Sequence, residues 1–109
     1  MCIYIDTFFC LDAEHTPEID VLNAAQSGAT SKELPEQVDY LIQHLGQDTA
    51  LADKWKLINV FIGFNDASVS CIPGRNVTEY KNNVKEALEQ LISQVDYAFI
   101  NLSKWWHRR

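Results

Sequence analysis

Asn65 and Asp66 are the residues whose types and position most suggest chemistry. They follow the apolar segment 55–62 after only Gly63 and Phe64. An asparagine amide that a strand lifts to the rim of a sheet can donate a hydrogen bond to developing negative charge. The same Gly-x-Asn-Asp sequence is equally typical of a β-turn that is chosen for its backbone preferences. Taken alone, this turn favours the second interpretation.

A run of small residues around Gly28 is the second candidate. Residues 23–31 read Asn-Ala-Ala-Gln-Ser-Gly-Ala-Thr-Ser and lead toward a helix. Backbone N–H groups at such a junction can converge on an anion. Small side chains also simply let a strand and a helix pack closely, and composition alone favours this explanation. The two candidates gain weight only if the fold brings them to one place.

Hydrophobic periodicity predicts the elements that position these loops. We expect strands at residues 19–25, 55–62 and 97–102, with a turn at 26–28 after the first and a loop at 64–75 after the second. A helix should start at Pro35, bury one apolar stripe and stop at Gly46. A second helix should start at Asn76, which would act as N-cap. Its expected buried stripe is Val77, Tyr80, Val84, Ala87, Leu88, Leu91, Ile92 and Val95.

This alternation of strands and helices predicts an α/β fold with a parallel sheet and right-handed crossovers. In such sheets, ligands bind at the carboxyl ends of the strands. Gly28 and Asn65 are both expected at that edge, each in a loop that follows a strand. The fold therefore links two candidates that are weak when taken separately.

Composition limits the classes of function. The chain has 109 residues, 47% of them hydrophobic, which suits one small folded domain. Its 15 acidic and 9 basic residues give a charge of −6, which argues against a nucleic-acid partner. No apolar run approaches the roughly 20 residues that cross a bilayer. The apolar segment 1–10 lacks the positive region of a secretory signal, so we interpret it as a strand or a truncated start.

Three cysteines, Cys2, Cys10 and Cys71, are an odd number, so at least one is free or is paired outside this chain. No Cys-x-x-Cys pair is present, and we expect no zinc site.

Several separated segments resemble the phospholipase B branch of the GDSL (SGNH) esterases. They are residues 22–29 (Leu-Asn-Ala-Ala-Gln-Ser-Gly-Ala), 33–37 (Glu-Leu-Pro-Glu-Gln), 53–58 (Asp-Lys-Trp-Lys-Leu-Ile), 61–66 (Phe-Ile-Gly-Phe-Asn-Asp) and 99–102 (Phe-Ile-Asn-Leu). They occur in the family's order and spacing. The resemblance divides the chain into a divergent segment 1–18, a partial hydrolase domain 19–102 and a divergent tail 103–109.

The resemblance implies a flavodoxin-like, three-layer α/β/α hydrolase with a parallel sheet, here incomplete. In this family a serine attacks an acyl ester, a histidine accepts its proton and an aspartate orients that histidine. Gly28 matches the glycine whose backbone N–H contributes to the oxyanion hole, and Asn65 matches the asparagine that contributes its side-chain amide. Asp66 is expected to brace the loop. The implied substrates are phospholipids or lysophospholipids, with no cofactor.

The departures from the family concern the groups that start the reaction. The family's nucleophile lies in a Gly-Asp-Ser-Leu block upstream of the matched region, and this chain contains no Gly-Asp-Ser. The Asp-x-x-His pair lies near the family's C-terminus, and we expect the chain to lack it too. We therefore expect an internal fragment that is inactive alone. The alternative is a noncatalytic lipid- or partner-binding module derived from the same fold.

The three histidines offer no convincing substitute base. His15 lies in a polar stretch, His44 is off the apolar stripe of its expected helix, and His107 lies in the tail. Phe64 replaces the usual second glycine of the family's Gly-Gly-Asn-Asp. Ser68 stands where this branch often has a cysteine that would pair with the position of Cys71.

Three remaining expectations concern the N-terminus, the surface and the location of the protein. Ile3, Ile5 and Phe8-Phe9 could form a strand that replaces the missing nucleophile strand. Asn76 and Asn101 lie in Asn-x-Ser/Thr sequons, although Asn76 is also explained as a helix cap. The tail 104–109 could contact a membrane surface or be a nonhomologous end. The resemblance implies a secreted or membrane-tethered extracellular protein, with no signal or anchor identified in this chain.

Overall fold

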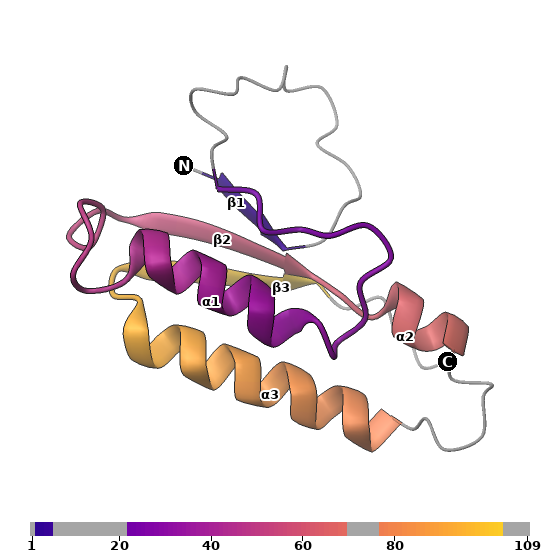
Figure 1. Cartoon of the computed structure of the whole chain (residues 1–109). Coiled ribbons are helices and arrows are strands. Elements are labelled where there is room, and N and C mark those ends of the chain that lie inside the picture. Colours follow the sequence, from indigo (N-terminus) through magenta and orange to yellow (C-terminus); the bar gives the residue numbers. More distant parts are fainter. Residues whose placement is uncertain (1, 6–21, 70–76, 104–109) are drawn as a thin grey trace.

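The computed structural model describes residues 2–5, 22–69 and 77–103 (Figure 1). In chain order the elements are β1 (Cys2–Ile5), α1 (Leu34–Leu45), β2 (Lys56–Phe61), α2 (Phe64–Val69), α3 (Val77–Gln94) and β3 (Ala98–Ser103).

The three strands form one parallel sheet in the order β1-β2-β3, so β2 is central. Ile58 of β2 is in register with Ile3 on one side and with Ile100 on the other. The predicted α/β fold with a parallel sheet is confirmed. The strand expected within residues 1–10 is present as β1, and the remaining residues of that segment lie outside the described part of the chain.

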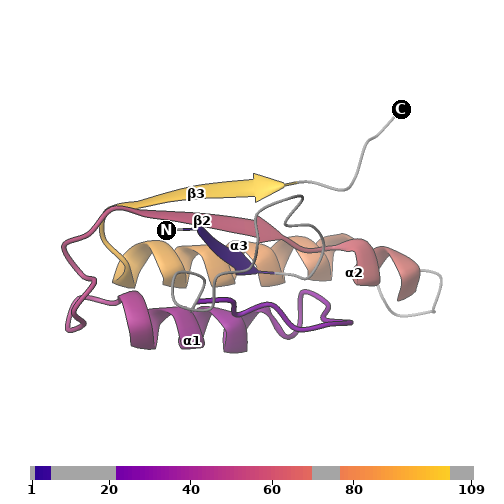
Figure 2. The same cartoon turned by 90° about the horizontal axis from the view of Figure 1, so that it is seen from above.

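Helices α1 and α3 lie side by side on the same face of the sheet (Figure 2). Alternate residues of the β2 segment, Ile58, Val60 and Ile62, are buried against them, as the two-residue period of a strand requires. The buried residues of the helices are Leu34, Gln37, Val38, Leu41 and Leu45 of α1 and Val84, Ala87 and Leu91 of α3. The core therefore lies between one face of the sheet and the two long helices.

Gly46 ends α1 as predicted, for a reason of space. Its backbone N–H donates to the carbonyl of Ile42 at 2.8 Å. A Cβ at this position would lie 2.5 Å from that carbonyl oxygen, closer than real side chains approach. The helix accordingly stops at a residue without a side chain.

Exposed aromatic side chains lie on β3 and just before β2 and β3 in the described residues. Phe99 of β3 is 66% exposed, and Trp55 and Tyr97 precede β2 and β3 with exposures of 74% and 53%. The rings of Trp55 and Tyr97 meet edge to face with centroids 5.5 Å apart. Phe99 alternates with Ala98 and Ile100, which pack against the core, so it lies on the face of the sheet that neither long helix covers (Figure 2).

The strand expected at residues 19–25 is not present in its described part. Residues 22–25 contain a single bridge residue, Asn23, and residues 19–21 lie outside the described ranges. The Asn23 side-chain oxygen accepts a hydrogen bond from the Ala25 N–H at 3.0 Å. Such a local bond competes with the ladder that a strand needs. The apolar alternation still buries Leu22 and Ala24, but against the core rather than within the sheet.

Two further expectations need correction. Residues 64–69, expected as a loop, form α2, whose first turn is closed by a bond from the Ala67 N–H to the Gly63 carbonyl at 2.9 Å. On α3, Val77 and Ile92 are 51% and 63% exposed, because the sheet and α1 cover only part of the stripe. The expected cap Asn76 lies outside the described residues.

Candidate oxyanion site at the carboxyl edge of the sheet

The two predicted loops meet at the carboxyl edge of the sheet. Asn65 lies in the first turn of α2, just beyond β2, and its Nδ2 donates to the carbonyl oxygen of Ala29 at 2.9 Å. Ala29 directly follows Gly28. The structure therefore places the Asn65 amide against the loop that contains Gly28, although the two residues are 37 positions apart in the sequence.

Gly28 has a backbone conformation that favours glycine. Its φ is +80°, in the region that L side chains adopt at a cost. A Cβ there would meet no atom within 4 Å, so the requirement is conformational rather than spatial. Gly28 is exposed to solvent. A glycine here shapes the loop and leaves it open to a ligand.

Asp66 ties the same two loops together a second time. Its Oδ2 accepts the Ser31 backbone N–H at 2.8 Å, and its Oδ1 is 2.5 Å from the Ser31 hydroxyl. These contacts match the bracing that we expected of Asp66. Ser31 is only 1% exposed and its hydroxyl is fully engaged, so this serine is unsuited to act as a nucleophile.

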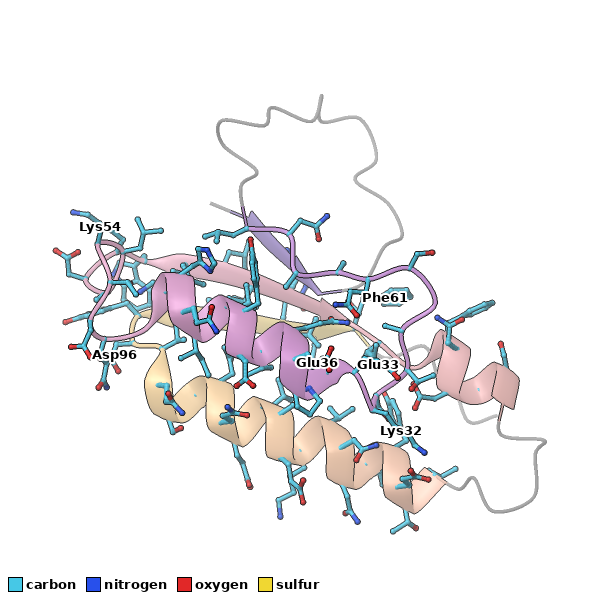
Figure 3. The ribbon with its side chains drawn as sticks, in the orientation of Figure 1. Lys32, Glu33, Glu36, Lys54, Phe61 and Asp96 are labelled. Carbon is cyan, nitrogen blue, oxygen red and sulfur yellow. The ribbon has the colours of Figure 1, made fainter. Side chains whose placement is uncertain are left out.

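The turn between Gly28 and α1 is itself held by side chains. Glu33 Oε2 accepts both the backbone N–H and the hydroxyl of Thr30, each at 2.7 Å. These bonds to the ionised form lower the pKa of Glu33 below its usual value. Lys32 pairs with Glu79 of α3 at 3.1 Å. Figure 3 shows Lys32 and Glu33 at this turn, near the end of the molecule where α2 lies.

Tyr80 of α3 contacts the chain just after β2, beside the site. Its hydroxyl donates to the Ile62 carbonyl at 3.1 Å, and burial together with the nearby charge of Asp66 raises the pKa of Tyr80. Gly63 has a φ of +121°, and a Cβ there would lie 3.0–3.2 Å from the Tyr80 ring and hydroxyl. Gly63 is thus required for both conformation and space. Phe64, the expected departure from the family, is 51% exposed.

Other predicted residues lie elsewhere. His44 is an exposed residue of α1 with its Nδ1 2.8 Å from the Tyr40 carbonyl. Asn101, one of the two sequon asparagines, donates to the side chain of Asn59 at 3.1 Å. Outside the described residues lie His15, His107, Cys10, Cys71 and Asn76. Within the described ranges, no cluster of three His, Cys, Asp or Glu side chains could hold a metal ion, and no helix is long and apolar enough to span a membrane.

One expectation about catalytic spacing is wrong in the sequence itself. Asp12-Ala13-Glu14-His15 does have the Asp-x-x-His spacing. It precedes the segments that resemble the family, whereas the family's pair follows them. It also lies outside the described residues. A scan for spacing without regard to order would have found it.

Comparison with known proteins decides the family. The model of the GDSL-like lipase/acylhydrolase family matches residues 11–105. The chain belongs to this family. Chains named "Phospholipase B1, membrane-associated" are similar to this GDSL-like chain. The protein from Homo sapiens is 33% identical over 85 residues, which is 74% of this chain, and that from Rattus norvegicus is 34% identical over 93 residues, or 82%.

The matched region is a small part of these relatives. The chain spans about 6% of the length of each of them. No solved structure matches it. Membership of the GDSL-like family agrees with the α/β fold.

Proposed function

We propose that this chain forms the oxyanion-hole part of a phospholipase B-like esterase. The reaction would be hydrolysis of acyl esters of phospholipids or lysophospholipids by a serine nucleophile. In this proposal the Gly28 backbone N–H and the Asn65 side-chain amide donate to the negative oxygen of the tetrahedral intermediate. The relatives are named as membrane-associated, which supports a place of action at a membrane, and the proposal adds that the protein is secreted or tethered outside the cell.

The observation that carries the proposal is the hydrogen bond between Asn65 Nδ2 and the Ala29 carbonyl. An asparagine amide has two N–H donors, and this bond uses one of them. The second has no partner among the described residues. The bond thus orients an available donor beside the exposed loop of Gly28, which is the arrangement that two oxyanion donors from separate loops need.

The same proposal predicts no turnover by these 109 residues alone, because they contain no Gly-Asp-Ser block and Asp12 and His15 are out of the family's order. The purified chain would be incubated with p-nitrophenyl butyrate and with lysophosphatidylcholine. We expect both substrates to be hydrolysed no faster than in buffer without protein. Hydrolysis that a single serine substitution abolishes would contradict the inactivity.

The oxyanion role can be tested in an active enzyme. Residues 22–102 would replace the matching segment of the human phospholipase B1 relative, and Asn65→Ala would be compared with Asn82→Ala in that chimera. Asn82 is an exposed residue of α3. Loss of one oxyanion donor should lower kcat by about 10²–10³ with little change in KM. Equal activity of the Asn65→Ala and Asn82→Ala chimeras would refute the role.

A noncatalytic lipid-binding module is the second candidate, favoured by the exposed aromatic side chains of Trp55, Tyr97 and Phe99. Tryptophan and tyrosine are common where proteins contact lipid headgroups. Binding of phosphatidylcholine vesicles would be measured by sedimentation, with hydrolysis followed in the same samples. Saturable binding without hydrolysis, weakened by Asn65→Ala, would support this candidate. An unfolded chain by circular dichroism would exclude it.

A further inference from the structure

We propose that Ser31 and Asn83 are positioning residues that hold the Asn65 amide in place through Asp66. The significance of that amide rests on the proposed function, but the positioning itself can be measured without it. Neither Ser31 nor Asn83 belongs to the pair of residues, Gly28 and Asn65, that the sequence assigned to the site.

The direction of the hydrogen bonds follows from the donors that are available. Asn83 Nδ2 donates to Ser31 Oγ at 3.1 Å. The Ser31 hydroxyl has one proton, and a carboxylate can only accept. That proton therefore goes to Asp66 Oδ1, 2.5 Å away. The result is a directed chain from Asn83 on α3, through Ser31, to Asp66 on α2.

Ala29 and Ser31 on one loop and Asn65 and Asp66 on the other then form a closed ring of hydrogen bonds. The Asp66 carboxylate accepts hydrogen bonds from the backbone N–H and the hydroxyl of Ser31, while the adjacent Asn65 donates to the Ala29 carbonyl. Ala29 and Ser31 are two residues apart, and Asn65 and Asp66 are consecutive. Separation of the two loops would break all three bonds together. The ring therefore restricts both the distance between the loops and the rotation of the Asn65 side chain.

Burial and charge make this ring stiff. Ser31 is 1% exposed, so water does not readily replace its partners. Hydrogen bonds to a carboxylate are shorter and stronger than those between neutral groups. Asn83 lies on α3, next to the buried Val84, so the chain of donors starts from a residue that the core holds in place. Removal of the Asn83 donor should loosen Asn65 without unfolding the core.

The experiment is hydrogen exchange by NMR on the 109-residue chain, read at the Asn65 Nδ2 protons and at the backbone amides of Ile58 and Val60. Asn83→Asp keeps the shape of the side chain but removes its donor, and Ser31→Ala removes the hydroxyl. Asn82→Ala and Ser27→Ala are matched controls at exposed neighbouring positions. We expect exchange at Asn65 to rise about tenfold in the first two variants, as the loss of a hydrogen bond predicts, and to stay unchanged in the controls.

The core amides separate positioning from general stability. Exchange at Ile58 and Val60 should rise much less than at Asn65, whereas a purely structural role would raise all of them by one factor. If both variants unfold, the wild-type chain decides: Asn65 Nδ2 must exchange more slowly than the exposed Asn82 Nδ2. Equal rates, or a uniform rise at Asn65 and the core, would overturn the positioning role. If Asn65 exchanges slowly in the 109-residue chain but Asn65→Ala leaves the activity of the chimera unchanged, only the proposed function is overturned.

Discussion

The two edges of the sheet are both closed by buried or partly buried polar side chains, but in different ways. At the amino edge, Lys56 is 2% exposed, and its Nζ donates to the carbonyls of Ala52 and Asp96 at 3.0 and 2.9 Å. At the carboxyl edge, Ser31, Asp66 and Asn83 bond mainly to one another. Figure 3 shows Lys54 and Asp96 at the first edge, far from Lys32 and Glu33 at the second.

The difference concerns what each edge can offer to a ligand. Lys56 uses its charge on backbone carbonyls and ties two turns to the strand, and burial lowers its pKa despite the opposing charges of Asp96 and Asp53. Nothing in that arrangement is exposed for binding. At the carboxyl edge the side chains satisfy each other around a loop, and an amide donor and an exposed glycine are left at the surface. Lys56 thus stabilises the fold at the amino edge, whereas the side chains at the carboxyl edge also present an amide donor and a glycine that could act on a ligand.

The largest expected effect breaks the amino edge. Lys56→Ala removes a buried aliphatic stem and the donor of two carbonyls, so the free energy of unfolding should fall by about 2–4 kcal/mol. Lys54→Ala, at an exposed neighbour, should change it by less than about 0.5 kcal/mol. Urea denaturation followed by circular dichroism measures both. Similar small losses in the two variants would show that the amino edge needs no buried amine.

The next effect breaks the carboxyl edge while keeping its shape. Asp66→Asn replaces one acceptor oxygen with a donor that faces Ser31, which should cost about 1.5–3 kcal/mol because the lost bonds are to a charged group. Asp53→Asn is the control, since its carboxylate is 76% exposed. The midpoint of urea denaturation gives the difference. A cost no greater than that of Asp53→Asn would show that Asp66 does not brace the two loops.

Two glycines sharpen the comparison within the carboxyl edge. Gly63→Ala should cost about 1–3 kcal/mol through backbone strain, and more if Tyr80 has to move. Gly28→Ala has open space around it and should cost about 1–2 kcal/mol from its conformation alone. Thermal denaturation compares the two variants. Equal melting temperatures would show that the Tyr80 contact adds nothing.

The smallest effect depends on pH. The lowered pKa of Glu33 means that its carboxylate stabilises the fold fully above its usual value of about 4.5, and that this contribution is lost as the pH falls through the folded-state pKa. Glu33→Gln should therefore be less stable than the wild type near neutral pH, by less than about 1 kcal/mol, because this side chain is partly exposed to solvent. The difference should vanish in acid. Denaturation curves between pH 7 and pH 3 test this, and a constant difference would contradict it.

Much of the fold could be predicted because its patterns are local. The β2 segment is rich in β-branched and aromatic residues and is followed by Gly63, and α1 places its apolar residues on one stripe with Pro35 near its start and Gly46 at its end. The failures are also local in origin. Asn23 makes a bond to its own loop, and the Gly63 carbonyl accepts the N–H that starts α2. Hydrophobicity patterns do not register bonds of this kind.

The candidate site could be predicted only in part. Gly28 and Asn65 are assigned to the site by the family resemblance. The position of Asn65 follows from its place just after β2, whereas residues 22–25 form no strand of the sheet, so the loop of Gly28 reaches this edge through the bond between Asn65 and the Ala29 carbonyl. Ser31, Asn83 and Tyr80 carried no such signal, because each acts through a contact with a residue far away in sequence. Lys56 gave a misleading signal. A charged residue among the apolar residues of a strand is expected at the surface, yet Lys56 is buried.

The sequence by itself determined the α/β class, the central strand, the two long helices and the family. Those depend on residue periodicity and on short motifs, which neighbouring residues set. Only the tertiary structure decided which side chains meet, that both long helices lie on one face of the sheet, and that the loop of Gly28 is held against Asn65 by Ser31, Asp66 and Asn83. The physical reason is that hydrogen bonds among buried side chains need partners within about 3 Å. Chain folding, and not spacing along the chain, brings residues 29, 31, 65, 66 and 83 within that reach.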